Sequence, residues 1–141
     1  MRSKLIFAGL VLSCLCSALY SCQSEDEITY ARYYVNGKGV YENHCQSCHG
    51  KNGEGLKALY PPLTDTTFMR VNKDRIACMI KYGISGKMVV GGREYDAEMP
   101  AETHLTDIDI AALITYITNS FGNKQGLYDA GMATRDLRDC R

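Results

Sequence analysis

The sequence predicts one all-α domain of three to five helices. Its 141 residues suit a single domain, because domains commonly contain roughly 100–200 residues. Segments 72–82 and 106–121 place apolar residues at helical spacing between capping and stop signals, and nothing before residue 45 has the pattern of a buried strand. The 16 basic and 16 acidic residues cancel, and no basic run is interleaved with aromatic residues, which argues against nucleic-acid binding.

Residues 1–21 have the pattern of a secretory signal. Arg2 and Lys4 precede an apolar stretch over residues 5–12, and serine and cysteine residues follow it. A retained transmembrane helix is the alternative, but such a helix needs about 20 mostly apolar residues, and only the first half of residues 5–23 is apolar. We expect this segment to be removed on export.

Residues 19–22 (LYSC) resemble the lipobox of bacterial lipoproteins, in which the cysteine becomes the lipidated first residue. That resemblance implies a lipid anchor on Cys22, with residues 22–33 as an anchored N-terminus and polar tether. The acidic residues that follow Cys22 fit a solvated linker. The expected location is the bacterial cell envelope, on the periplasmic side or at the outer membrane.

The first helix of the domain is expected over residues 34–46. This segment contains Gly37 and Gly39, although glycine costs about 1 kcal/mol in a helix interior. Glycine at such positions indicates close packing against another element.

Residues 45–49 (CQSCH) form the Cys-x-x-Cys-His motif of covalent haem attachment. Two thiols three positions apart on a helical turn can reach the two vinyl groups of one porphyrin edge, and the histidine that follows can place an imidazole nitrogen at the iron. The motif predicts that Cys45 and Cys48 bind one haem c and that His49 is an axial ligand.

Three other interpretations of the motif fit the sequence less well. A thioredoxin-like redox pair requires a βαβ context, which the segment before Cys45 does not offer. A structural zinc site needs a second pair of ligands, but Cys22, Cys78 and Cys140 stand alone in the sequence. A disulfide between the two cysteines leaves His49 without a role.

From about residue 34 to residue 123, the chain resembles the class I cytochromes c. The matching pieces, in the family's order and spacing around the haem motif, are residues 37–41 (GKGVY), 49–50 (HG), 52–55 (NGEG), 60–63 (YPPL), 91–95 (GGREY), 99–100 (MP), 105–107 (LTD) and 114–117 (ITYI). The resemblance implies the class I cytochrome c fold, with three to five helices packed around one covalently attached haem.

The resemblance also implies the second axial ligand. The family's methionine ligand lies in a loop before the last helix, often followed by proline, and Met99 fits that position. Met88 is the second choice, and His104 is the candidate if both ligands are histidines. An open sixth position remains the third possibility. His44 is expected to face solvent or a haem propionate, and Met69 and Met79 are expected in the core.

The resemblance further implies two supporting contacts. A carbonyl within residues 60–63, by spacing that of Pro61, is expected to accept a hydrogen bond from the His49 imidazole. The first and last helices are expected to cross at Gly37 and Tyr41, opposite Leu113 and Tyr116.

Two further helices follow from the sequence. Residues 51–67 are expected to form a loop, followed by a helix with Asn72 as N-cap that ends at Gly83. The last helix is expected from the N-cap Thr106 to Phe121, with Gly122 as its stop.

Two features of the chain stay open. Cys78 is either a buried free thiol or the partner of Cys140, since nothing in the sequence brings the two together. Residues 124–141 are an extension that either wraps the domain or is disordered.

These observations predict a monohaem c-type cytochrome that carries single electrons between redox partner proteins. It would be held at the membrane by Cys22, possess no small-molecule substrate and serve as part of a respiratory chain. The alternatives are a haem-containing subunit of a terminal reductase or oxidase, and an open-site haem enzyme with peroxidase-like or gas-binding activity.

Overall fold

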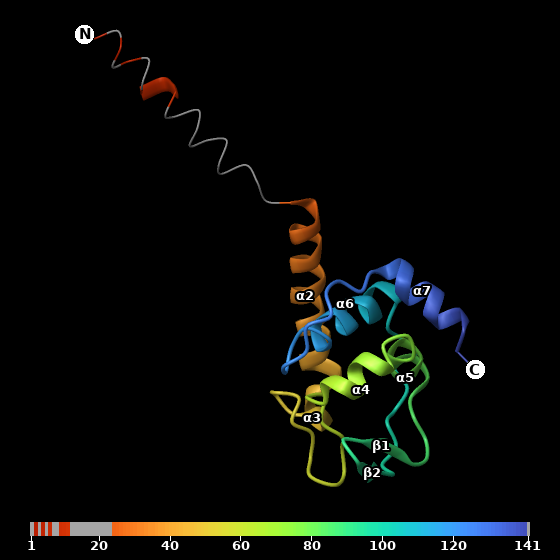
Figure 1. The fold of residues 1–141 in the computed structure, drawn as a ribbon. Helices are drawn as coiled ribbons and strands as arrows, with labels where there is room; N and C mark the ends of the chain where they lie inside the picture. Colours follow the sequence, from red (N-terminus) through yellow and green to blue (C-terminus); the bar gives the residue numbers. More distant parts are fainter. Residues whose placement is uncertain (1, 3, 5, 7–8, 12–23, 141) are drawn as a thin grey trace.

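The computed structural model describes residues 2, 4, 6, 9–11 and 24–140. Most of the signal segment 1–21 and the lipidation candidate Cys22 lie outside the described residues. The named elements are α2 (Glu25–His44), α3 (Gln46–His49), α4 (Thr66–Val71), α5 (Ile76–Tyr82), β1 (Met88–Val90), β2 (Arg93–Tyr95), α6 (Asp107–Ile117) and α7 (Ala130–Arg138) (Figure 1). The predicted all-α class is confirmed, with one short antiparallel hairpin added to the helices.

Helix α2 starts nine residues before the predicted position. Ser24 is its N-cap, since the Ser24 side chain accepts a hydrogen bond from the Glu27 backbone at 3.2 Å. Three acidic residues occupy the first turn, where negative charge is favourable beside the positive end of the helix dipole. Most of the segment assigned to a polar tether is therefore helical, and α2 ends at His44 rather than at residue 46.

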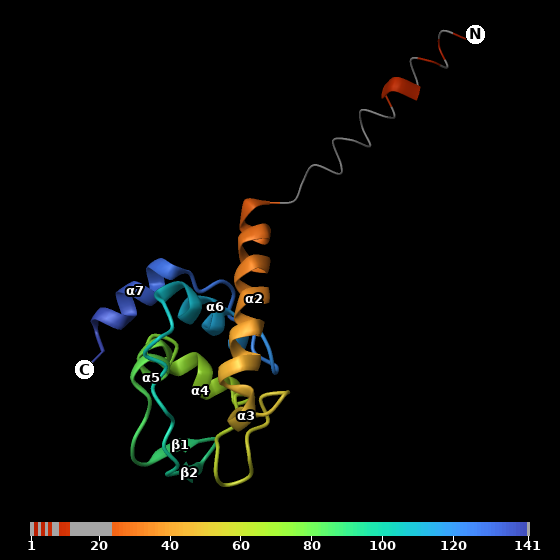
Figure 2. The same cartoon turned by 180° about the vertical axis from the view of Figure 1, so that it is seen from behind.

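Helices α2 and α6 cross at Gly37, and this contact organises the domain (Figures 1 and 2). A β-carbon on Gly37 would overlap the backbone carbonyl of Ala112 and lie 2.9 Å from Cβ of Tyr116. The ring of Tyr116 lies 5.4 Å from that of Tyr41, centroid to centroid. The predicted crossing is confirmed at these residues, but Ala112 faces Gly37, whereas Leu113 lines a cavity on another side of α6.

Helix α6 begins as predicted at the N-cap Thr106. The Thr106 hydroxyl accepts the Asp109 backbone N–H at 3.3 Å, and the Asp109 carboxylate accepts the Thr106 backbone N–H at 3.0 Å, which completes a capping box. These hydrogen bonds lower the pKa of Asp109. The helix ends at Ile117, earlier than predicted, and Phe121 adopts a positive φ of 57° that a helix cannot include.

The segment after the haem motif differs from the prediction. Asn72 ends α4 instead of starting a helix, because its backbone N–H donates to the carbonyl of Phe68. Helix α4 itself begins at Thr66, inside the predicted loop, where Asp65 accepts two backbone hydrogen bonds as N-cap. Helix α5 starts only at Ile76 and ends at Gly83 as predicted.

The C-terminal extension packs on the domain through α7, which covers α6 and α5 (Figure 1). Tyr128 is fully buried, and its hydroxyl donates to the Asp136 carboxylate at 2.6 Å. Its backbone N–H and carbonyl both bond the hydroxyl of Thr115, at 3.0 and 2.9 Å. Burial, and then the Asp136 carboxylate, raise the pKa of the Tyr128 hydroxyl. Of the two possibilities, the extension therefore wraps the domain.

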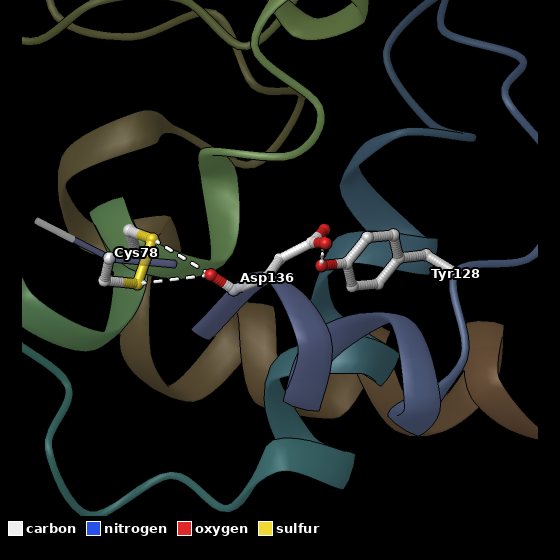
Figure 3. The surroundings of a disulfide bond; sticks show 4 residues. Cys78, Tyr128 and Asp136 are labelled. Atoms are coloured by element: carbon white, nitrogen blue, oxygen red, sulfur yellow. Dashed lines mark hydrogen bonds between the residues drawn. A yellow bond between two sulfur atoms is a disulfide. The ribbon is translucent and has the colours of Figure 1, made fainter. Parts of the chain in front are cut away.

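Cys78 and Cys140 form a disulfide that closes the extension onto α5 (Figure 3). The two α-carbons lie 5.5 Å apart, although 62 positions separate the residues in sequence. Both sulfur atoms contact the backbone oxygen of Asp136 at 3.6 Å, and its carboxylate holds Tyr128 (Figure 3). The sequence left this pairing open.

We expect the double substitution Cys78→Ser and Cys140→Ser to lower the free energy of unfolding by about 2–3 kcal/mol, because the disulfide restricts a long loop in the unfolded chain. Urea unfolding measures the loss. Adding reductant to the unsubstituted protein should reproduce it, and equal stability of the oxidised and reduced forms would contradict the prediction.

Candidate functional site

A large apolar cavity lies beside α6. It encloses about 1180 Å³ of empty space, counting its open mouth. Its wall includes Leu113 and Ile117 of α6, aliphatic and aromatic residues of α4 and α5, and inward-facing residues of the hairpin. Such a cavity, apolar with a few convergent polar groups, suits a flat apolar cofactor better than a polar substrate.

All three chemical groups of the predicted haem motif line this cavity. Helix α2 ends at His44, Cys45 links it to the single turn of α3, and Cys45, Cys48 and His49 contribute to the wall. The two cysteines are not joined to each other. Two unpaired thiols and an imidazole in the wall of an apolar cavity form the donor set that covalent haem attachment requires.

His49 is held by a carbonyl. Its Nδ1 lies 3.0 Å from the backbone oxygen of Pro61, which fixes Nδ1 as the donor and leaves Nε2 free to bind a metal. Burial lowers the pKa of His49, while the Pro61 contact partly opposes that shift. The imidazole is therefore favoured in its neutral form, which is the form that ligates iron.

The loop that carries Pro61 is tied to the rest of the domain. The backbone N–H of Leu63 donates to the Gly53 carbonyl at 2.8 Å, and the Asn123 amide donates to the Leu63 carbonyl at 2.9 Å. Asn123 is itself almost fully buried. These bonds position the Pro61 carbonyl from both sides, and no separate signal in the sequence pointed to this role of Asn123.

The chemistry of Cys45 does not suit a disulfide-exchange enzyme. Burial raises the pKa of the Cys45 thiol to about 12, and Glu102 and Cys48 add to the shift. Redox-active cysteines of the thioredoxin type have lowered pKa values, because the thiolate is the reacting species. The structure therefore favours attachment over disulfide exchange at this motif.

Met99 is partly buried and lines the same cavity. Its backbone forms two hydrogen bonds with Ile84, each of 2.9 Å, which tie the loop before α6 to the end of α5. Met88 also lines the cavity from β1, where Val90 faces inward with it and Val89 is exposed. Both predicted thioether candidates thus reach the site, and Met99 has the more firmly held backbone.

The remaining predicted residues take other places. His104 lies at the surface with 62% of its side chain exposed, beside Glu102, so it is a poor candidate for an iron ligand. His44 lines the mouth of the cavity and also contacts Glu102. Met69 belongs to the buried core as predicted, whereas Met79 lines the cavity wall.

Sequence reasoning missed much of the cavity wall. Val90 and Tyr95 come from the unpredicted hairpin, and Phe68 comes from a helix placed inside the expected loop. The paired glycines of the hairpin turn, Gly91 and Gly92, both adopt positive φ and were an available signal for the hairpin.

Comparison with known proteins identifies the family. Residues 34–117, more than half of the chain, match the family model described as cytochrome c oxidase, cbb3-type, subunit III. The chain belongs to this family of c-type cytochromes. As a cytochrome domain, it is a monohaem electron-carrying protein with one covalently bound haem c.

Individual relatives agree with this assignment. The cytochrome domain is 27% identical over 93 residues to cytochrome c-552 of Thermus thermophilus, which covers 63% of this chain and 70% of that protein. Cytochrome c-552 from a named strain of the same species is also 27% identical over 93 residues, 62% of its length. The fructose dehydrogenase cytochrome subunit of Gluconobacter japonicus is 32% identical over 104 residues, 68% of this chain but only 21% of that protein.

Proposed function

We propose that this cytochrome is a one-electron carrier that exchanges electrons with redox partner proteins at the outer side of a bacterial membrane. The observation that carries this proposal is the cavity in which His49, oriented by the Pro61 carbonyl, and Met99 both reach the cofactor space. An iron with both axial positions filled by protein has no open site for a substrate.

We assign each site residue a role within this proposal. Cys45 and Cys48 hold the haem c as thioethers, and His49 and Met99 are the axial ligands. Haem c supplies an iron that alternates between the ferric and ferrous states. Pro61 maintains the orientation and basicity of His49, and the apolar wall excludes water, which favours the less charged ferrous state.

An envelope location is part of the same proposal. Residues 1–21 are taken as a lipoprotein signal peptide and Cys22 as the lipid-bearing residue, with more than one acyl chain giving stable anchoring. The Cys78–Cys140 disulfide supports this location, since such bonds persist in oxidising compartments such as the bacterial periplasm. Among the described residues, no helix is both long and apolar enough to cross a membrane.

A second candidate function is that of a haem-carrying subunit within an oxidoreductase complex. The family description names an oxidase subunit, and one relative is named a dehydrogenase cytochrome subunit. The cavity would serve equally in either setting, because an electron-transfer module needs the same ligands in a complex as alone. Co-purification with membrane proteins would favour this second candidate.

Protein-film voltammetry of the purified cytochrome, combined with carbon monoxide titration of its ferrous form, tests the proposal. We expect one reversible one-electron couple and no carbon monoxide binding, since Met99 occupies the sixth position. Rapid binding of carbon monoxide by the unsubstituted protein would instead support an open-site enzyme.

A further inference from the structure

A cluster of two histidines and one carboxylate lies at the mouth of the cavity. Oε2 of Glu102 lies 3.4 Å from Nδ1 of His44 and 3.4 Å from Nε2 of His104. One ligand atom from each residue falls within 4.8 Å of the other two. His44 ends α2, whereas Glu102 and His104 lie in the loop before α6, so the cluster joins two segments distant in sequence.

The distances match metal coordination better than hydrogen bonding. Charge-assisted N–H···O bonds between histidine and carboxylate are shorter, about 2.7–2.9 Å. Ligand atoms about 2.1 Å from a tetrahedral zinc ion are separated by about 3.4 Å along each edge of the tetrahedron. Both measured contacts have this length. We infer that His44, Glu102 and His104 form a binding site for one divalent transition-metal ion, of which zinc is the test case.

The loop that carries two of the ligands is held in place without a metal. The Glu102 backbone N–H donates to the Ile80 carbonyl at 3.0 Å. The Lys81 ammonium group donates to the carbonyls of Thr103 and Leu105, at 2.8 and 2.7 Å. His44 is fixed by the last turn of α2. A metal would therefore meet three ligands already close to their bound positions, which lowers the entropic cost of binding.

Charge and access also favour a cation at this place. The Glu102 side chain is 17% exposed and stays close to both imidazoles, whereas 62% of the His104 side chain is exposed and gives an entry path from solvent. The Asp109 carboxylate lies near enough to both histidines for their charges to lower its pKa, so a second negative group faces the cluster. Water would complete a four-coordinate site.

The cluster is adjacent to the proposed haem, because His44 and Glu102 also line the cavity. A divalent charge there disfavours the ferric state, so metal binding should raise the midpoint potential. By linkage, the ferrous protein should bind the metal more tightly than the ferric protein. This consequence rests on the proposed function, whereas the metal site itself does not.

Isothermal titration of zinc into the untagged, haem-loaded cytochrome tests the site. We expect one zinc ion per chain, with binding at least about 10-fold weaker for His104→Gln and for Glu102→Gln. Glu94→Gln removes an exposed carboxylate from β2 and is the matched control, for which binding should be unchanged. His104→Gln changes a surface side chain, so the variant should retain its fold.

Two results would overturn the inference: no saturable zinc binding at one ion per chain, or equal affinity in the unsubstituted and His104→Gln proteins. Because calorimetry detects the metal without electron transfer, failure of the proposed carrier function would leave this test unaffected. The midpoint potential with and without zinc then tests the link to the haem, and an unchanged potential beside intact binding would refute that link alone.

Discussion

Substituting Gly37 with alanine should destabilise the protein by about 4 kcal/mol, although alanine is the better helix former. The new β-carbon would overlap the Ala112 carbonyl, which belongs to the backbone of α6 and cannot rotate away. Helices α2 and α6 would have to separate, and the Tyr41–Tyr116 contact beside the cavity would be lost. Thermal and urea unfolding of the haem-loaded protein measure the loss.

Gly39→Ala is the matched control, two positions away in the same helix. A β-carbon on Gly39 meets nothing within 4 Å, so this substitution should stabilise the protein by up to about 1 kcal/mol through helix propensity. Opposite signs for the two variants would attribute the effect to the helix crossing. Similar effects at both positions would contradict it, because helix propensity acts on both alike.

The second large effect is expected from Met99→Ala. Loss of the thioether should open the sixth position of the iron, so that the ferrous protein binds carbon monoxide and the midpoint potential falls by on the order of 100 mV or more. The weak absorption band of methionine-ligated ferric haem, at roughly 695 nm, should disappear. Visible spectra of the oxidised and reduced protein detect the first and third changes, and voltammetry detects the second.

Met88→Ala is the control for this substitution, since Met88 lines the same cavity from β1. We expect it to retain the far-red band and to exclude carbon monoxide. If instead Met88→Ala removes the band and Met99→Ala leaves it unchanged, the ligand assignment is reversed. The fold around the hairpin, where Met88 lies, would then supply the axial ligand.

Local signals allowed the start of α6 to be predicted from sequence alone. Thr106 and Asp109 form a capping box whose hydrogen bonds span three residues, so neighbouring positions in sequence contain the whole device. The start of α2 is equally local, with Ser24 as the cap, but its acidic first turn has the composition of a solvated linker. Composition alone could not distinguish a charged helix end from a tether.

Contacts between distant segments were harder to predict. Nothing near Cys78 or Cys140 indicates that α7 returns across α5, because the pairing depends on how Tyr128 is buried against Thr115 and Asp136. The hairpin strands have three residues each, which is too short for alternation to be recognised. The site prediction came from the attachment motif and from the resemblance, which together place ligands that spacing alone leaves open.

Covalent haem attachment can be tested by the mass of the mature, acid-denatured chain beside that of a Cys45→Ala and Cys48→Ala double variant. We predict that the unsubstituted chain retains one haem through denaturation and organic extraction, whereas the double variant releases it. Loss of haem from the unsubstituted chain under the same conditions would contradict covalent attachment through these two cysteines.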